Sequence, residues 1–297
     1  MVSKNNNGKN RKYSVSPLYP ALKRLKPCKR QTAPAAGHGW QLPQRTAGSP
    51  DIYQKSMTQD VKKSVSYLPE ISSEVTEGCL RDYDIKVLQP RYGYRFSIDS
   101  LLLADFVRPR KYDHILDIGT GCGVIALVLA KKHSNVKITA LEIQKDLAEI
   151  AGKNIRLNHL DGQITVDELD LNRIPEVFSA GSFDYVVANP PYRSPVSGRL
   201  CKNSQETLAR HEILTDLDQI LSAARYALHP GGRISLIYRA DRAARLLAGM
   251  HELNLEPKRL RMIHPDLNLP AKLILVEGCK DAGEELKILP PIFLNRP

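Results

Sequence analysis

Segments with the apolar pattern of buried strands alternate with segments of helical periodicity from about Glu70 onwards. Apolar runs of strand length predict five strands, at residues 114–119, 136–143, 164–169, 183–188 and 233–238. Apolar residues at helical spacing predict helices around them, at residues 98–107, 124–133, 144–160, 214–228 and 241–254. This alternation is typical of a parallel sheet wrapped by helices, because parallel neighbours need a crossover connection.

Two more strands are predicted after this pattern, at residues 258–263 and 273–277. The loop between them contains proline and is too short for a crossover helix, so they should pair antiparallel. We therefore expect a Rossmann-like α/β fold. Its sheet should be seven-stranded and mostly parallel, with helices on both faces and an antiparallel C-terminal strand pair.

Residues 1–68 are rich in Asn, Pro, Gly, Ser and Lys and lack periodic apolar spacing. Such a segment cannot bury enough surface to offset its ordering entropy, so we expect a disordered extension before a folded domain at residues 69–297. The extension can be a tail that attracts RNA, an organellar transit segment, sequence upstream of a start at Met57, or simply a solvated tail. It contains no apolar segment of the secretory type.

The net charge of +11 belongs almost entirely to this extension. Residues 1–56 hold eleven lysines and arginines against Asp51 alone, which leaves the rest of the chain at +1. Overall basicity therefore does not identify a nucleic-acid partner, and any basic groove must come from local arrangement.

The cysteines argue against a metal site or a disulfide framework. All five lie far apart, without a CxxC pair or a histidine at ligand spacing: Cys28, Cys79, Cys122, Cys201 and Cys279. We expect no metal and a reducing, cytoplasmic compartment. No apolar run approaches the roughly 18 residues that span a bilayer, so no membrane is expected as a partner.

The strand at residues 114–119 opens into a glycine-rich turn, DIGTGCG. Gly119, Gly121 and Gly123 let the backbone turn sharply and let a ligand approach without a Cβ in the way. Their GxGxG spacing differs from the GxGxxG of dinucleotide-binding proteins, which disfavours NAD. Asp117 suits a ligand with an amino or sulfonium group, and the pattern indicates S-adenosylmethionine as cofactor.

Acidic residues at the ends of the next two strands can complete a cofactor site. Glu142, 19 residues beyond Gly123, can accept both hydroxyls of a ribose. Asp170 can receive an adenine amino group, but Asp167 and Glu168 are close by and the register is open. The alternatives are an exposed strand-end acid for Glu142 and a plain tight turn for the glycines.

The strand at residues 183–188 leads into Asn-Pro-Pro-Tyr and is expected beside the first strand of the sheet. An amine on an aromatic base or an amide nitrogen is a poor nucleophile because its lone pair is delocalised. The oxygens of Asn189 and Pro190 can accept its two N–H bonds and turn the lone pair towards a sulfonium methyl. Tyr192 offers a face for stacking. A plain proline turn would explain Pro190 and Pro191 alone, so we predict amino-methylation that depends on positioning rather than on a strong base.

Residues from about 70 to 297 resemble the bacterial tRNA1(Val) adenine-N6 methyltransferases, class I enzymes that modify the adenosine 3′ of the anticodon. The resemblance rests on QPRYGYRFSIDSLLLA at residues 89–104, on DIGTGCG, on NPPY and on ARHE at residues 209–212. It implies a tRNA substrate and S-adenosylmethionine. It also implies methionine and ribose contacts from Asp117, Gly119, Gly121 and Glu142, and amine binding by Asn189, Pro190 and Tyr192.

The same resemblance places Arg95, Phe96 and Asp99 near the cofactor and the entering base, with Arg95 on the cofactor side. Ser97 and Asp99 have an equally good alternative role. Ser97 can cap the helix at residues 98–107, with Asp99 favourable in its first turn.

One position departs from the family pattern, because Arg193 stands where related sequences often carry an aromatic residue. Base stacking there is in doubt, although a guanidinium can stack or hold a phosphate. Arg193 joins Pro191 and Arg210 as predicted substrate contacts. The further candidates for an RNA-facing loop, which can equally be a solvated charged segment, are Arg199, Lys202 and His211.

Other functions fit parts of the pattern. A glutamine-N5 methyltransferase acting on release factors shares the fold and NPPY, but residues 89–104 and the lack of a separate N-terminal helical domain disfavour it. Other NPPY-type rRNA or DNA amino-methyltransferases are further alternatives. A non-catalytic RNA-binding protein on a decayed fold is disfavoured by intact Asp117, Glu142 and Asn189. We expect a monomer.

Overall fold

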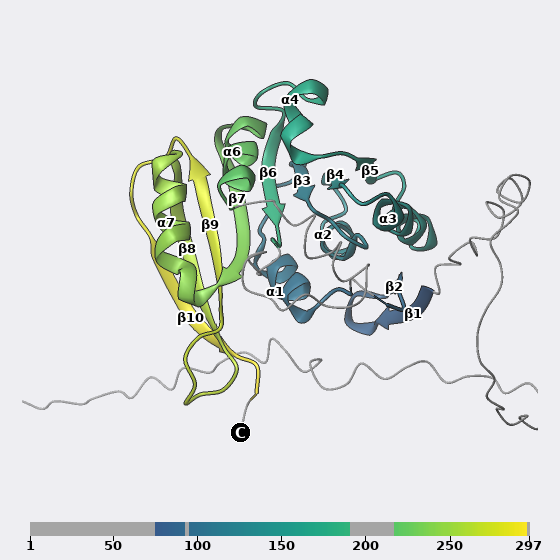
Figure 1. Ribbon diagram of the computed structural model, residues 1–297, viewed down its shortest axis with the longest axis horizontal. Coiled ribbons are helices and arrows are strands. Elements are labelled where there is room, and N and C mark those ends of the chain that lie inside the picture. The colour runs from purple at the N-terminus through teal and green to yellow at the C-terminus, as the bar shows by residue number, and fades with distance from the viewer. Residues whose placement is uncertain (1–74, 93–94, 191–216, 296–297) are drawn as a thin grey trace, which may run out of the picture.

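The computed structural model describes residues 75–92, 95–190 and 217–295. Its central feature is an eight-stranded sheet (Figure 1). Listed by position across the sheet, the strands are β10 (Lys287–Phe293), β8 (Leu255–His264), β9 (Leu273–Lys280), β7 (Leu228–Arg239), β6 (Phe183–Ala188), β3 (His114–Ile118), β4 (Lys137–Glu142) and β5 (Ile164–Glu168). The predicted Rossmann-like α/β fold is confirmed.

The strand directions also agree with the prediction. Strands β7, β6, β3, β4 and β5 run parallel, and β9 pairs antiparallel with β7 and β8. The sheet has one strand more than the seven predicted, because β10 adds to β8 in parallel. Its prolines, Pro290 and Pro291, are tolerated at a sheet edge or an irregularity, and the register shifts between Leu289 and Ile292.

Helices cover both faces of the sheet, and each face has its own core. On one face lie α1 (Ile98–Phe106), α2 (Val124–Lys132) and α3 (Lys145–Leu157); on the other lie α4 (Ile174–Val177), α6 (Leu217–Ala227) and α7 (Ala243–Glu252). Successive residues of a strand face the two cores in turn, as Ile115 and Leu116 of β3 do. Asp117 therefore faces α1 and α2.

Most predicted boundaries agree with the structure to within a few residues. Strand β7 is the main exception, because it begins at Leu228 and continues through the predicted entry turn at residues 230–232. The predicted helix at residues 241–254 begins as a 3₁₀ turn, η5 (Ala240–Arg242), before α7. Of the helix predicted at residues 214–228, residues 214–216 lie outside the described ranges.

A two-stranded antiparallel hairpin precedes the main fold and was not predicted. It consists of β1 (Val75–Leu80) and β2 (Ile85–Pro90), joined by the 3₁₀ turn η2 (Arg81–Tyr83). The hairpin lies beside α3 and leads towards the beginning of α1 (Figure 1). It therefore brings the segment at residues 89–104 towards the glycine turn.

The predicted disordered extension at residues 1–68 lies outside the described ranges. No helix within those ranges is long and apolar enough to cross a membrane. Within the same ranges, no three His, Cys, Asp or Glu residues come together as a metal site.

Candidate active site

The end of β3 brings a buried acid to the carboxyl edge of the sheet. Asp117 is 0% exposed, and its Oδ2 accepts a hydrogen bond from Oγ1 of Thr120 at 2.6 Å. Its Oδ1 has no hydrogen-bond partner in the described part of the chain. Buried polar atoms normally have one, so this oxygen is suited to accept a hydrogen bond from a ligand.

Burial dominates the electrostatics of this acid. Desolvation raises the pKa of Asp117 to about 7. The hydrogen bonds from Thr120 and from the backbone of Ala126 oppose that rise, and the charge of Glu142 adds to it. Burial also raises the pKa of Glu142, against hydrogen bonds from the backbone of Gln144 and Gly121. A cationic ligand group next to the two acids favours their ionised forms.

The turn after β3 depends on glycine backbone conformations. The φ angles are +69° at Gly119, +58° at Gly121 and +84° at Gly123. A Cβ on Gly119 would meet no atom within 4 Å, so the turn leaves open space there. A Cβ on Gly123 would make an ordinary contact of 3.4 Å with Cβ of Ala151, so the positive φ rather than crowding is what favours glycine at this position.

Glu142 ends β4 and holds the same turn from the neighbouring strand. Its Oε2 accepts a hydrogen bond from the backbone N–H of Gly121 at 2.8 Å, and its Oε1 accepts one from that of Gln144 at 3.0 Å. Its side chain is 5% exposed. The plain alternative of an exposed strand-end acid is therefore wrong, and Asp117, the turn and Glu142 form one buried unit.

Asp170 lies beyond the end of β5, at the start of the 3₁₀ turn η3 (Leu171–Arg173). Its Oδ1 accepts hydrogen bonds from the backbone and the side-chain amide of Asn172, both at 2.9 Å. Asp167 and Glu168, the other acids in question, are exposed in β5. Asp170 thus has a capping role in this structure.

Asn189 follows β6, which pairs in parallel with β3, so it lies at the same sheet edge as Asp117. Its Nδ2 donates a hydrogen bond to Oγ of Ser100 at 3.2 Å. Ser100 is 2% exposed and lies in the first turn of α1. The residues 89–104 and the NPPY motif therefore meet directly. The sequence interpretation missed Ser100, although it lies inside the segment that carries the family resemblance.

The other predicted residues before α1 differ in their surroundings. Ser97 caps α1 as predicted, accepting a hydrogen bond from the backbone N–H of Asp99 at 3.3 Å. Arg95 is exposed and donates to Oγ1 of Thr76 at 3.4 Å. Phe96 is half-buried and packs against the core on the α1 face.

Arg95 also acts on the glycine turn through its charge. Burial and the charge of Glu142 raise the pKa of the Cys122 thiol to about 12, and the Arg95 guanidinium opposes this rise. Pro190 is buried next to Asn189. The remaining predicted contacts lie outside the described residues: Pro191, Tyr192, Arg193, Arg199, Lys202, Arg210 and His211.

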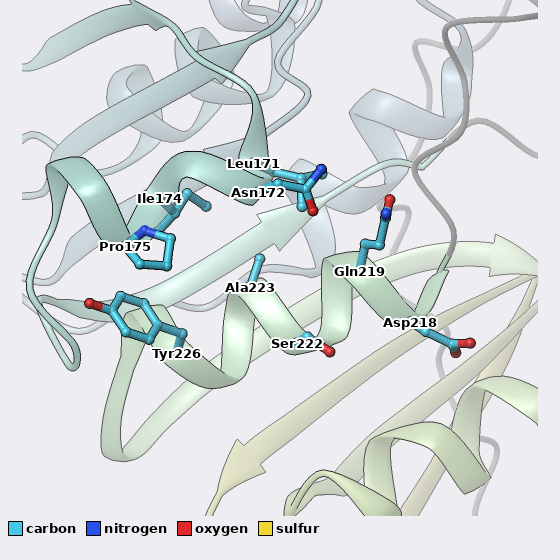
Figure 2. Close-up of a pocket in the computed structure, with 9 residues that line it drawn as sticks. All are labelled: Leu171, Asn172, Ile174, Pro175, Asp218, Gln219, Ser222, Ala223 and Tyr226. Atoms are coloured by element: carbon cyan, nitrogen blue, oxygen red, sulfur yellow. The ribbon is translucent and has the colours of Figure 1, made fainter.

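A surface groove of about 330 Å³ lies between η3, α4 and α6 (Figure 2). Leu171, Ile174 and Pro175 line one side, and Ala223 and Tyr226 on α6 line the other. None of the predicted site residues lines it. The groove is therefore separate from the unit formed by Asp117, the glycine turn and Glu142.

A parallel sheet with a glycine turn and two buried acids at its switch point, and an amide directly after the adjacent strand, defines a Rossmann-like methyltransferase. The family model named "Methyltransferase small domain" matches residues 95–253, more than half of the chain. The chain belongs to this family and, within it, to the tRNA1(Val) (adenine(37)-N6)-methyltransferases.

The assignment to the tRNA1(Val) (adenine(37)-N6)-methyltransferases rests on curated relatives that carry this name. The protein of Phocaeicola vulgatus is 32% identical, and that of Parabacteroides distasonis is 30% identical. Each alignment covers 64% of this chain and 79% of the relative. A solved structure, a predicted O-methyltransferase from Agrobacterium tumefaciens, is 23% identical, has a TM-score of 0.52 and covers 66% of this chain and 86% of that one. It supports the fold alone.

Proposed function

We propose that this chain transfers a methyl group from S-adenosylmethionine to N6 of an adenosine in tRNA, the adenosine 3′ of the anticodon in tRNA1(Val). The observation that carries the proposal is the position of Asn189 directly after β6, the strand that pairs with the one carrying Asp117 and leading into the glycine turn. The relatives' names supply the substrate. The domain responsible is residues 69–297, acting as a monomer in the cytoplasm.

The buried unit at the carboxyl edge fits this methyl donor, which supplies an electrophilic methyl on a sulfonium. The unpartnered Oδ1 of Asp117 accepts from the amino group of the methionine part. The open space at Gly119, with Gly121 and Gly123 in the same turn, allows close approach of the backbone. Glu142 accepts from the ribose hydroxyls.

Two more residues complete the proposed donor site. Arg95 offers a cation for the carboxylate of the methionine part, in keeping with its electrostatic effect on the turn. Asp170 receives the adenine amino group with the oxygen that does not cap Asn172.

On the substrate side, Asn189 and Pro190 accept the two N–H bonds of the adenine amino group. The nitrogen lone pair then points along the line of displacement, and alignment supplies much of the rate. No base is required before transfer, because the amine becomes acidic as the new bond forms. Tyr192, Phe96 and Pro191 contact the flat base.

RNA binding requires the base to leave its stack, which costs less in a single-stranded loop than in a duplex. Asp99, at the mouth of α1, contacts the entering nucleotide in this proposal. Arg193 and Arg210 hold phosphates of the loop.

The test is to add radioactive S-adenosylmethionine to bulk tRNA and, separately, to purified release factor. We expect label in tRNA, recovered as N6-methyladenosine by nucleoside mass spectrometry. Asn189→Ala should reduce the rate by about a hundredfold or more, as for loss of a preorganised acceptor, while sinefungin binding persists. Label in release factor supports the glutamine-N5 alternative, and label in neither supports a non-catalytic RNA-binding protein.

A further inference from the structure

A buried asparagine on α3 joins two segments of the proposed donor site. Asn154 is 0% exposed, and a buried amide needs partners for its oxygen and its two N–H bonds. Its Oδ1 accepts from the backbone N–H of Leu88 at 2.6 Å. Its Nδ2 donates to the carbonyls of Leu88 at 2.8 Å and Cys122 at 2.9 Å.

On the side that faces the hairpin, the Asn154 amide makes the two hydrogen bonds that a neighbouring strand would make. It exchanges both backbone hydrogen bonds with Leu88, and Asn158, one helical turn later, does the same with Lys86 at 2.9 and 2.7 Å. The opposite edge of β2 pairs with β1. The two asparagines therefore satisfy backbone groups on the edge of β2 that β1 leaves open.

Towards the glycine turn, Asn154 makes a contact that Asn158 lacks. Cys122 lies between Gly121 and Gly123 and is 1% exposed. Glu142 holds the peptide group between Thr120 and Gly121 through the N–H of Gly121, and Asn154 holds the peptide group between Cys122 and Gly123 through the carbonyl of Cys122. The turn is thus fixed on both sides of its central residue.

We propose that Asn154 is a positioning residue that fixes the glycine turn against β2 and thereby sets the affinity for the methyl donor. The inference rests on the proposed function, because the turn is the donor site. Glycines in the left-handed region have broad conformational freedom, so the turn keeps its shape only where outside contacts hold it. If one such contact is lost, the donor must order the turn when it binds. The free energy of this ordering is subtracted from the binding free energy, so the donor affinity falls.

The experiment compares Asn154→Ala with Asn158→Ala. This control loses its hairpin contact and its hydrogen bond to the backbone carbonyl of Asn154, but no contact at the turn. Sinefungin affinity is measured by calorimetry, thermal unfolding by circular dichroism, and KM by methylation of tRNA. Both variants should unfold at lower temperature. Asn154→Ala should also weaken sinefungin binding and raise the donor KM about tenfold, the effect of one unpaired buried group. Asn158→Ala should stay within about twofold of wild type, and the KM for tRNA should change in neither.

Equal weakening of donor binding in both variants, or none in Asn154→Ala, overturns the inference while the proposed function stands. Failure of the wild-type protein to bind sinefungin overturns the proposed function and the inference with it. If Asn154→Ala does not fold, Asn154→Ser replaces it. The serine hydroxyl offers one donor in place of two, and an unchanged donor affinity in that variant is again a contradiction.

Discussion

At the scale of single residues, the burial that suits Asp117 to its proposed binding role also lowers the stability of the fold at neutral pH. Its folded pKa is near 7, well above the roughly 4 of an unfolded aspartate. Between these values the native state retains a proton that the unfolded chain has lost. The stability that protonated Asp117 contributes is fully present below about pH 4 and is lost as pH rises to about 7.

The variant Asp117→Asn removes this titration. We expect its free energy of unfolding to exceed that of the wild type by about 1–2 kcal/mol at pH 5 and by about 4 kcal/mol at pH 8, measured by urea unfolding. Sinefungin binding should be weakened at both pH values, because the amide carries no negative charge to pair with the ligand's ammonium group and replaces one accepting oxygen with a donating NH2. A stability difference between the two proteins that does not vary with pH contradicts this account.

In the proposed reaction, Ser100 positions the amide of Asn189. Because an amide is planar, a hydrogen bond that fixes Nδ2 on Ser100 also fixes the direction of Oδ1. Ser100→Ala should lower kcat about tenfold, the cost of one lost buried hydrogen bond, with unchanged sinefungin affinity. Ser100→Thr keeps the hydroxyl and should retain most of the rate. A wild-type kcat in Ser100→Ala would assign the contact to packing alone.

At the scale of elements, the glycine turn reverses the chain and, in the proposed function, also binds the methyl donor. Gly119 and Gly231 form a matched pair, with φ of +69° and +79° and open space where a Cβ would stand. An alanine costs about 1 kcal/mol of backbone strain at either position. Only Gly119 lies in the proposed donor site.

We therefore expect Gly119→Ala and Gly231→Ala to lower Tm by similar amounts. Gly119→Ala should also weaken sinefungin binding more than about tenfold, because its methyl group occupies the space that the donor needs. Gly231→Ala should bind as the wild type does. Unaltered binding by Gly119→Ala would place the donor elsewhere.

At the scale of the whole molecule, a buried polar network joins the C-terminal strands to the parallel sheet. Tyr185 of β6 donates a hydrogen bond to Oε2 of Glu277 on β9 at 2.5 Å. The same carboxylate accepts hydrogen bonds from Nε and Nη2 of Arg259 on β8, at 2.7 and 2.6 Å. Burial, with the nearby charge of Glu277, raises the pKa of Tyr185, which keeps its hydroxyl protonated. Three strands are thus held in one register.

Arg259→Leu leaves Glu277 buried at 6% exposure without its counter-charge. We expect a loss of about 3–5 kcal/mol in the free energy of unfolding, measured in urea. The exposed pair of Arg173 with Glu176 provides the control. Arg173→Ala should cost less than about 1 kcal/mol, since exposed ion pairs contribute little. Equal losses in the two variants would mean that the network does not join the strands.

The fold was largely predictable because its signals are local. Apolar periodicity marked seven of the eight strands of the main sheet, and the crossover connections between the first five predicted that these five run parallel. Strand β10 was not predicted, because its two prolines are compatible with a strand only at a sheet edge, and an edge position is not visible in the sequence. The hairpin of β1 and β2 was not predicted, because it is short and the hydrogen bonds along its open edge come from the side chains of Asn154 and Asn158.

The candidate site also contains some residues that the sequence predicted and others that it did not. The positions of Asp117, Glu142 and Asn189 at strand ends follow from the sequence, because parallel strands bring their carboxyl ends to one edge. A signal for Asn154 was present, since a polar residue stands on the apolar face of α3 with Ile150 and Ala151. Its partners are distant in sequence, so its role was not visible.

The sequence by itself thus determined the order of elements and the kinds of chemical groups at the sheet edge, because both depend on local pattern and connectivity. Tertiary structure alone decided that Ser100 orients Asn189, that Asn154 holds the glycine turn and that Asp117 has a raised pKa. These properties depend on burial and on contacts between distant segments, which exist only once the chain has folded.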